Sequence, residues 1–211
     1  MEYETEEQQV EALKAWWAEN GKAVIAGVVL GVGIIGGWSF WQGREEKLAV
    51  AASDAYSETM TAVTAGEGAS VVALADELTD NHGGTLYAAY ASLAAARVAV
   101  EEGDLETAAA RLDWVVDAAP QEDIQLIATV RLARVEGALG KGETALERLP
   151  SEYPDTFTGL IEEARGDLLA ASGDAAAARS AYEKAQASGN VVDANALTMK
   201  INELAVAESA S

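Results

Sequence analysis

The longest apolar segment of the chain lies near its start, at residues 23–43, and reads AVIAGVVLGVGIIGGWSFWQG without a charged residue. A helix of these 21 residues, rising about 1.5 Å per residue, covers roughly 30 Å, the thickness of the hydrocarbon core of a bilayer. Four of the five tryptophans flank this segment, as in the aromatic belts at membrane interfaces: Trp16, Trp17, Trp38 and Trp41. The pattern predicts one transmembrane helix.

Two other interpretations of this segment fit less well. A buried helix of a soluble core would be destabilised by six glycines within 21 residues, whereas glycine is better tolerated in lipid. A cleaved signal peptide begins with a short positive region, but the first 22 residues carry six acids against Lys14 and Lys22. We therefore expect an uncleaved anchor. Arg44 and Lys47 beyond the segment balance the two lysines before it, so charge does not set its orientation.

The anchor and the tail before it contain two further patterns. Val10, Leu13 and Trp17 fall at helical spacing opposite Glu11, which predicts a short amphipathic helix at the interface. This helix could contact a cytosolic partner or only rest on the membrane surface. Within the span, small residues recur at four-residue spacing, which lets another helix approach closely in lipid; they are Ala23, Gly27 and Gly31, with Gly33 and Gly37 as a second pair. They form either a docking face or a generic glycine-rich span.

The sequence after the span has the pattern of helices throughout. It is rich in Ala, Leu, Glu and Arg, contains the chain's three prolines, and has no sustained alternation of β-branched residues. The expected helices cover residues 45–65, 69–80, 85–102, 105–118, 122–139, 142–149, 157–172, 175–188 and 191–207.

Glycine turns divide these helices into repeating pairs. Gly103, Gly140 and Gly173 are 37 and 33 residues apart, close to the tetratricopeptide period of about 34. Five residues after each glycine stands alanine, and nine residues after it a large residue: Ala108, Ala145 and Ala178, then Leu112, Leu149 and Tyr182. A further hairpin is expected before them, with Gly68 in the turn and Ala73 at the small position. An ordinary helical bundle is the alternative architecture.

The predicted fold is therefore all-α, with one N-terminal transmembrane helix followed by a tetratricopeptide-repeat-like α-solenoid. We divide the chain into an acidic tail at residues 1–22, the span at 23–43 and a repeat domain at 44–211. Each hairpin has an apolar face that it cannot bury alone, so stacked neighbours form the core. The last helix, near residues 191–206, is expected to cap the stack.

The first helices of the hairpins are expected to line a concave face that binds protein segments. Counting back from the turn glycines gives the candidate contacts: Tyr90, Leu93, Arg97, Val100, Ile127, Val130, Arg134, Glu163 and Asp167. Arg97 and Arg134 occupy equivalent positions and could hold a carboxylate or the backbone carbonyls of an extended peptide. They could equally pair within the protein, Arg97 with Glu101 and Arg134 with an acid of the neighbouring repeat.

Charge and composition restrict the partners. The chain has a formal net charge of −21, and most of it lies after the span. Such a surface repels phosphate backbones and anionic headgroups, which argues against nucleic acid and favours basic or apolar protein segments. With His82 as the single histidine and no cysteine, neither a Cys-His pair nor a multi-histidine metal site can form. No catalytic residue, metal site or cofactor is predicted.

The order of segments resembles a known family. The tail contains VEALKAWWAENGK, the glycine-rich span ends in GGWSFWQG, and degenerate tetratricopeptide repeats follow. This arrangement is similar to the YfgM family, the ancillary subunits of the bacterial SecYEG translocon. The resemblance implies an inner-membrane, non-enzymatic protein with a cytoplasmic N-terminus and a periplasmic repeat domain. It also implies contact with membrane lipid, SecYEG, the membrane-anchored chaperone PpiD and emerging clients. A repeat scaffold for an unrelated envelope complex is the alternative.

Overall fold

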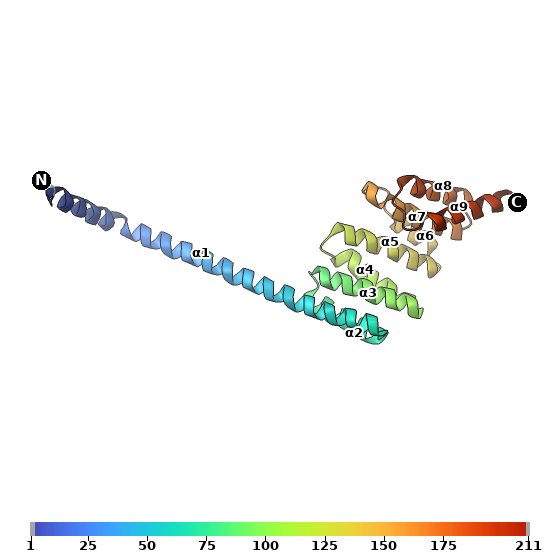
Figure 1. The fold of residues 1–211 in the computed structure, drawn as a ribbon, viewed down its shortest axis with the longest axis horizontal. Coiled ribbons are helices and arrows are strands. Elements are labelled where there is room, and N and C mark those ends of the chain that lie inside the picture. The colour runs from blue at the N-terminus through green and yellow to red at the C-terminus, as the bar shows by residue number, and fades with distance from the viewer. Residues whose placement is uncertain (1–2, 210–211) are drawn as a thin grey trace. The chain divides into compact units, whose positions relative to one another are not determined.

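The computed structural model describes residues 3–209, and the side chains of residues 8–42 and 46–205 within them. Helices make up the described elements (Figure 1), with these bounds: α1 Tyr3–Ala65, α2 Gly68–His82, α3 Leu86–Glu102, α4 Leu105–Ala118, α5 Glu122–Ala138, α6 Gly142–Arg148, the 3-10 helix η1 Asp155–Phe157, α7 Thr158–Ala171, α8 Ala175–Ser188 and α9 Ala194–Ser209. Residues 3–209 contain no strand, so the predicted all-α class is confirmed.

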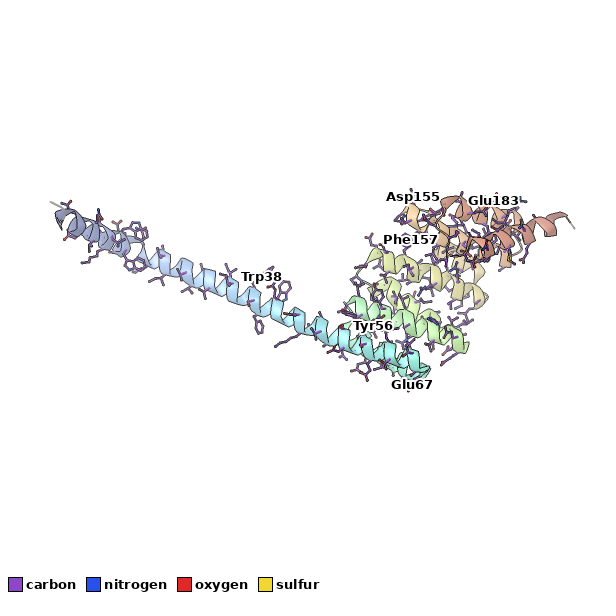
Figure 2. The ribbon with its side chains drawn as sticks, in the orientation of Figure 1. Trp38, Tyr56, Glu67, Asp155, Phe157 and Glu183 are labelled. Atoms are coloured by element: carbon purple, nitrogen blue, oxygen red, sulfur yellow. The ribbon has the colours of Figure 1, made fainter. Side chains whose placement is uncertain are left out.

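The chain forms two units, residues 1–50 and 51–211. In the first unit, α1 exposes large apolar side chains, with exposed fractions from 42% for Leu48 to 77% for Phe40. Trp38 projects from the helix (Figure 2) and meets Trp41 edge to face at 5.9 Å between ring centroids. By length and composition, α1 is a candidate membrane span.

The anchor region is one uninterrupted helix in the structure, which differs from the sequence prediction. We expected a short tail helix, a span and a separate helix at residues 45–65, but α1 includes all three. The physical reason is that this region contains glycines and no proline, and glycine weakens a helix without breaking its hydrogen bonds. At Gly21 the Trp17 ring packs over the helix, 3.2 Å from the position that a Cβ would take.

In the second unit, each of four hairpins turns through a glycine in the left-handed region, with φ between 73° and 87°: Gly66, Gly103, Gly140 and Gly173. The same pair of backbone bonds closes each turn. At Gly103, the glycine N–H donates to Val100 and the next N–H, of Asp104, donates to Ala99, at 3.1 and 2.8 Å. This is the Schellman helix end, which favours glycine because a Cβ is strained there.

The first of these turns was predicted at the wrong glycine. Gly68 is the first residue of α2, and the turn itself is made by Gly66. The position five residues later is Val71, which is fully buried, whereas Ala73 is exposed. Gly66 also lies 37 residues before Gly103, the same separation as between Gly103 and Gly140.

The core runs along the stack as four clusters, and each one joins neighbouring helices. The first packs the end of α1 with α2 and α3, the second α3 with α4 and α5, the third α5 with α6 and α7, and the fourth α7 with α8 and α9. The six positions predicted from the repeat register are all buried, with at most 4% exposure. The repeat prediction is therefore confirmed at the level of packing, and no single cluster includes every helix.

The closest helix approach of the last hairpin is between Gly166 on α7 and Tyr182 on α8. A Cβ built on Gly166 would lie 2.4 Å from two ring carbons of Tyr182. The ring is buried, and its hydroxyl donates a 2.9 Å hydrogen bond to Asp167 Oδ1. A residue without a side chain is therefore required at this crossing.

Gly166→Ala is expected to lower the free energy of unfolding by about 1 to 3 kcal/mol, because the new methyl group overlaps a ring that cannot move aside without losing its hydrogen bond. Thermal unfolding of the full-length protein in detergent, followed by circular dichroism, measures the effect. Gly84→Ala is the matched control, since a Cβ there meets nothing within 4 Å. Equal midpoints for the two variants would contradict this packing.

A buried carboxylate holds the long connection between α6 and α7 in place. Glu162 on α7 is 4% exposed. It accepts hydrogen bonds from the Tyr153 hydroxyl and from Lys184 Nζ, the latter at 2.8 Å, and Arg165 Nε lies 3.5 Å away. Burial raises the pKa of Glu162, but the bonds from Lys184 and Tyr153 and the nearby cations outweigh it, so the pKa lies below its ordinary value.

The contribution of Glu162 to stability is expected to depend on pH. Since its folded-state pKa is lowered, the ionised group stabilises the fold at neutral pH, and this stabilisation is lost as the pH falls through the folded-state pKa. The difference in unfolding midpoint between wild type and Glu162→Gln should therefore shrink from about pH 7 to about pH 3. Glu183→Gln, which removes an exposed partner of Arg179, should change stability little at either pH. A difference that grows towards low pH would refute the assignment.

Candidate functional groove

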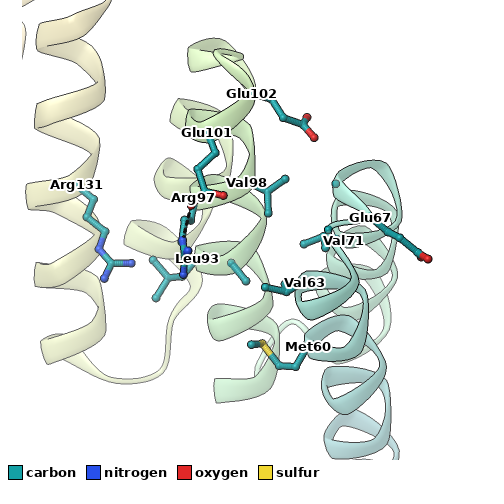
Figure 3. Close-up of a pocket in the computed structure, with 13 residues that line it drawn as sticks. Met60, Val63, Glu67, Val71, Leu93, Arg97, Val98, Glu101, Glu102 and Arg131 are labelled. Atoms are coloured by element: carbon teal, nitrogen blue, oxygen red, sulfur yellow. Dashed lines mark hydrogen bonds and ion pairs between the residues drawn. The ribbon is translucent and has the colours of Figure 1, made fainter.

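Three hollows follow one another along the first helices of the hairpins. The first, of about 390 Å³, lies between the end of α1 and α3 and includes Arg131 of α5 (Figure 3). The second, of about 330 Å³, lies between α3 and α5, and the third, of about 640 Å³, between α5 and α7. Leu93, Arg97 and Arg131 line both the first and the second hollow, and Arg134 lines the second and the third. We call this continuous feature the groove.

Five of the nine predicted contact residues line the groove. They are Leu93, Arg97, Val100, Arg134 and Asp167. Val130 differs from the prediction, because it is fully buried in the cluster with Ile161 and presents no surface. Tyr90 packs against the Tyr56 ring at 6.2 Å, and Ile127 is half-buried on α5. The contact role of the lining residues stays a prediction.

Both predicted arginines are engaged within the protein. Arg97 Nε donates to Glu101 Oε1 at 2.7 Å, one turn along α3. Arg134 Nε lies 3.8 Å from Asp167 Oδ2 on α7, so an acid of the neighbouring repeat is its partner. Of the two interpretations of these residues, internal pairing is the one that the structure contains.

Arg131 is the lining residue that sequence reasoning missed. It lies on α5 one turn before Arg134 and points towards Leu93 and Arg97 (Figure 3). By the 37-residue period, Arg131 corresponds to Ala94 of the preceding repeat. A search for the same residue type at equivalent repeat positions therefore does not find it. Its spacing of three residues from Arg134 was the available signal, because such residues share one helix face.

The α7 end of the predicted surface is held by α9. Lys200 Nζ on α9 donates to Glu163 Oε1 at 2.9 Å and to Asp167 Oδ1 at 2.7 Å. Burial lowers the pKa of Lys200, but these two carboxylates raise it more, so its pKa lies above the ordinary value. Glu163 and Asp167 therefore form part of an internal ion cluster that attaches the last helix.

Lys200→Met is expected to lower the unfolding midpoint by a few degrees, corresponding to about 1 kcal/mol, because Glu163 loses its cation in a half-buried site. The Lys141→Met variant, at an exposed turn position, removes the same charge as a control and should leave the midpoint unchanged. Thermal unfolding of both full-length variants measures the two midpoints. If they unfold together, the cluster does not hold α9.

The small residues of the anchor lie open on α1. A Cβ built at Gly27, Gly31, Gly33 or Gly37 would meet no other atom within 4 Å. Ala23, Gly27 and Gly31 follow one another at helical spacing and form one stripe, while Gly33 and Gly37 lie on another side of the helix. In the described part of the chain nothing covers either stripe, and no group of three or more metal-ligating side chains occurs there.

These features define a class: a helical repeat protein with a candidate membrane anchor and a groove along the first helices of its hairpins. A family model described as a tetratricopeptide repeat-like domain matches residues 14–206. The chain is 37% identical to the ancillary SecYEG translocon subunit of Escherichia coli strain K12, over 97% of this chain and 98% of the relative. It is 33% identical to the subunit of the same name from Haemophilus influenzae, over 94% and 97%.

The chain therefore belongs to the YfgM family of ancillary SecYEG translocon subunits. A third relative with this name, from Aggregatibacter actinomycetemcomitans, is 29% identical over 94% of the chain. No solved structure matches the chain. The family and the repeat fold indicate a membrane-associated, non-catalytic ancillary subunit.

Proposed function

We propose that this protein is an ancillary subunit of the SecYEG protein-export translocon, with α1 inserted in the inner membrane through residues 23–43. The tail at residues 1–22 lies in the cytoplasm and the repeat domain at 44–211 in the periplasm. In this arrangement the repeat domain contacts a membrane-anchored periplasmic chaperone of the PpiD kind and emerging client proteins. The observation that carries the proposal is the combination, in one chain, of an anchor with open small-residue stripes and a grooved repeat domain.

The anchor supports membrane docking through its packing surface. Helices associate in lipid mainly by close van der Waals packing, because the lipid removes the hydrophobic driving force between them. Stripes without side-chain bulk allow that approach, and here they lie beside large apolar residues that are 60–71% exposed, such as Val28 and Ile34. A translocon or chaperone helix would fit this surface.

The repeat domain supports protein binding rather than catalysis. Its groove is open, extends across the four first helices, and combines apolar floor residues with arginines. Solenoids bind extended segments on such surfaces. Residues 51–205 thus provide a contact surface for folded chaperones or unfolded clients.

Site-specific photocrosslinking from α1 in native membranes tests the proposal. A probe at Leu30 lies beside the stripe of Ala23, Gly27 and Gly31, and a probe at Val32 lies on the side of the helix away from both stripes, with equal exposure. We expect Leu30 to capture translocon or chaperone helices more strongly than Val32, and Gly31→Ile to reduce this capture. Capture of lipid alone, or of an unrelated envelope complex, would remove the translocon assignment.

A further inference from the structure

The central part of the groove, the second hollow, has an apolar floor surrounded by cations. Its floor comes from three helices and consists of Leu93, Ala96 and Val100 on α3, Leu112 on α4 and Val135 on α5. Three arginines and one acid complete the lining: Arg97, Arg131, Arg134 and Glu101. In a chain with 35 acids against 14 lysines and arginines, this local excess of positive charge is opposite in sign to the rest of the surface.

Arg131 differs from the other two arginines because it has no acidic partner. Arg97 is bound to Glu101 and Arg134 to Asp167, and among the side chains of residues 8–42 and 46–205 no carboxylate forms an ion pair with Arg131. Arg131 is exposed, but partial desolvation by its neighbours and the charge of Arg134 both lower its pKa. The guanidinium therefore stands beside a like charge on an apolar floor, an arrangement that an incoming carboxylate would stabilise.

The groove continues on both sides of Arg131. The first hollow shares Leu93, Arg97 and Arg131 with the second, and the third shares Arg134. The hollows therefore adjoin, so a segment longer than the central hollow has space on both sides of it. This geometry favours a segment that runs through the groove, with its carboxylate on a side chain rather than at its terminus.

We propose that the centre of the groove binds an extended protein segment in which an acidic side chain pairs with Arg131 and apolar side chains two residues away rest on the apolar floor. Side chains two residues apart in an extended chain point to the same face, so an apolar-x-acidic-x-apolar segment presents its apolar side chains and its carboxylate to the groove together. The proposal rests on the proposed role of the groove as a protein-contact surface, and it adds the chemistry of the segment. The acidic surface elsewhere favours basic segments, so Arg131 would separate one class of partner from the others.

A peptide double-mutant cycle tests the pairing directly. The probe is the labelled peptide Ser-Leu-Ser-Glu-Ser-Leu-Ser, acetylated and amidated, and its counterpart has Gln in place of Glu. Binding to the full-length protein in nanodiscs of neutral lipid is followed by fluorescence anisotropy. We expect the Glu peptide to bind about tenfold more tightly than the Gln peptide. Arg131→Gln should bind the two peptides equally.

Matched variants separate pairing from general charge and from folding. Lys141→Gln removes one positive charge at an exposed position outside the lining of the second hollow and should keep the tenfold preference. Arg131→Gln should unfold at or above the wild-type temperature, because it relieves repulsion from Arg134. Arg131→Lys, which keeps the charge but not the planar fork, should show an intermediate preference.

Several outcomes would overturn the proposal: no binding of either peptide by wild type, equal binding of both, or a Glu preference that survives Arg131→Gln. Tighter binding of the Gln peptide when its C-terminus is a free carboxylate would show that the groove receives a chain end instead. The crosslinks from Leu30 do not depend on Arg131. If the crosslinks are kept but the peptide test fails, only the proposed groove chemistry is rejected. If the crosslinks are lost but the peptide test succeeds, only the translocon assignment is rejected.

Discussion

The repeat domain depends on the left-handed glycine that ends the first helix of each hairpin. At Gly66, Gly103, Gly140 and Gly173 the same two backbone bonds satisfy carbonyls at the helix end and reverse the chain. This places an alanine or valine of the second helix against the first, and in the last three hairpins a large residue one turn later fills the space beside it. Because each hairpin buries its apolar face only against its neighbours, an error in one turn would expose the clusters on both sides.

Much of this architecture could be predicted from the sequence, because its causes are local. A glycine turn and the buried positions five and nine residues later depend on helix geometry within one hairpin, and the register placed Ala108, Ala145 and Ala178 correctly. The turn at Gly66 was missed because Gly68 stands two residues away, and composition does not show which of two glycines adopts positive φ. The continuity of α1 was missed because the tail, the span and residues 45–65 were recognised from different patterns, none of which shows whether the helix continues between them.

The groove was harder to predict, since its properties depend on contacts between repeats. Arg97 and Arg134 occupy equivalent repeat positions and were predicted to contact a ligand. In the structure both have internal partners: Glu101 on the same helix for Arg97, and Asp167 on α7 for Arg134. Val130 sits in a predicted groove register but is turned into the core between α5 and α7. Lys200 joins Glu163 and Asp167 over more than thirty residues of sequence. Such pairs follow from how neighbouring hairpins stack, which periodicity within one sequence does not specify.

Neighbouring repeats differ at the position of Arg131, and this difference affects how a bound segment would be aligned in the groove. A solenoid whose repeats were identical would offer a ligand several equivalent alignments, each shifted by one hairpin. Here the position in the preceding repeat that corresponds to Arg131 is Ala94. Of these two repeats, only one therefore has a guanidinium at this position. A bound segment whose acidic side chain pairs with Arg131 would therefore be held in one alignment, because a shift by one hairpin would place that side chain at Ala94.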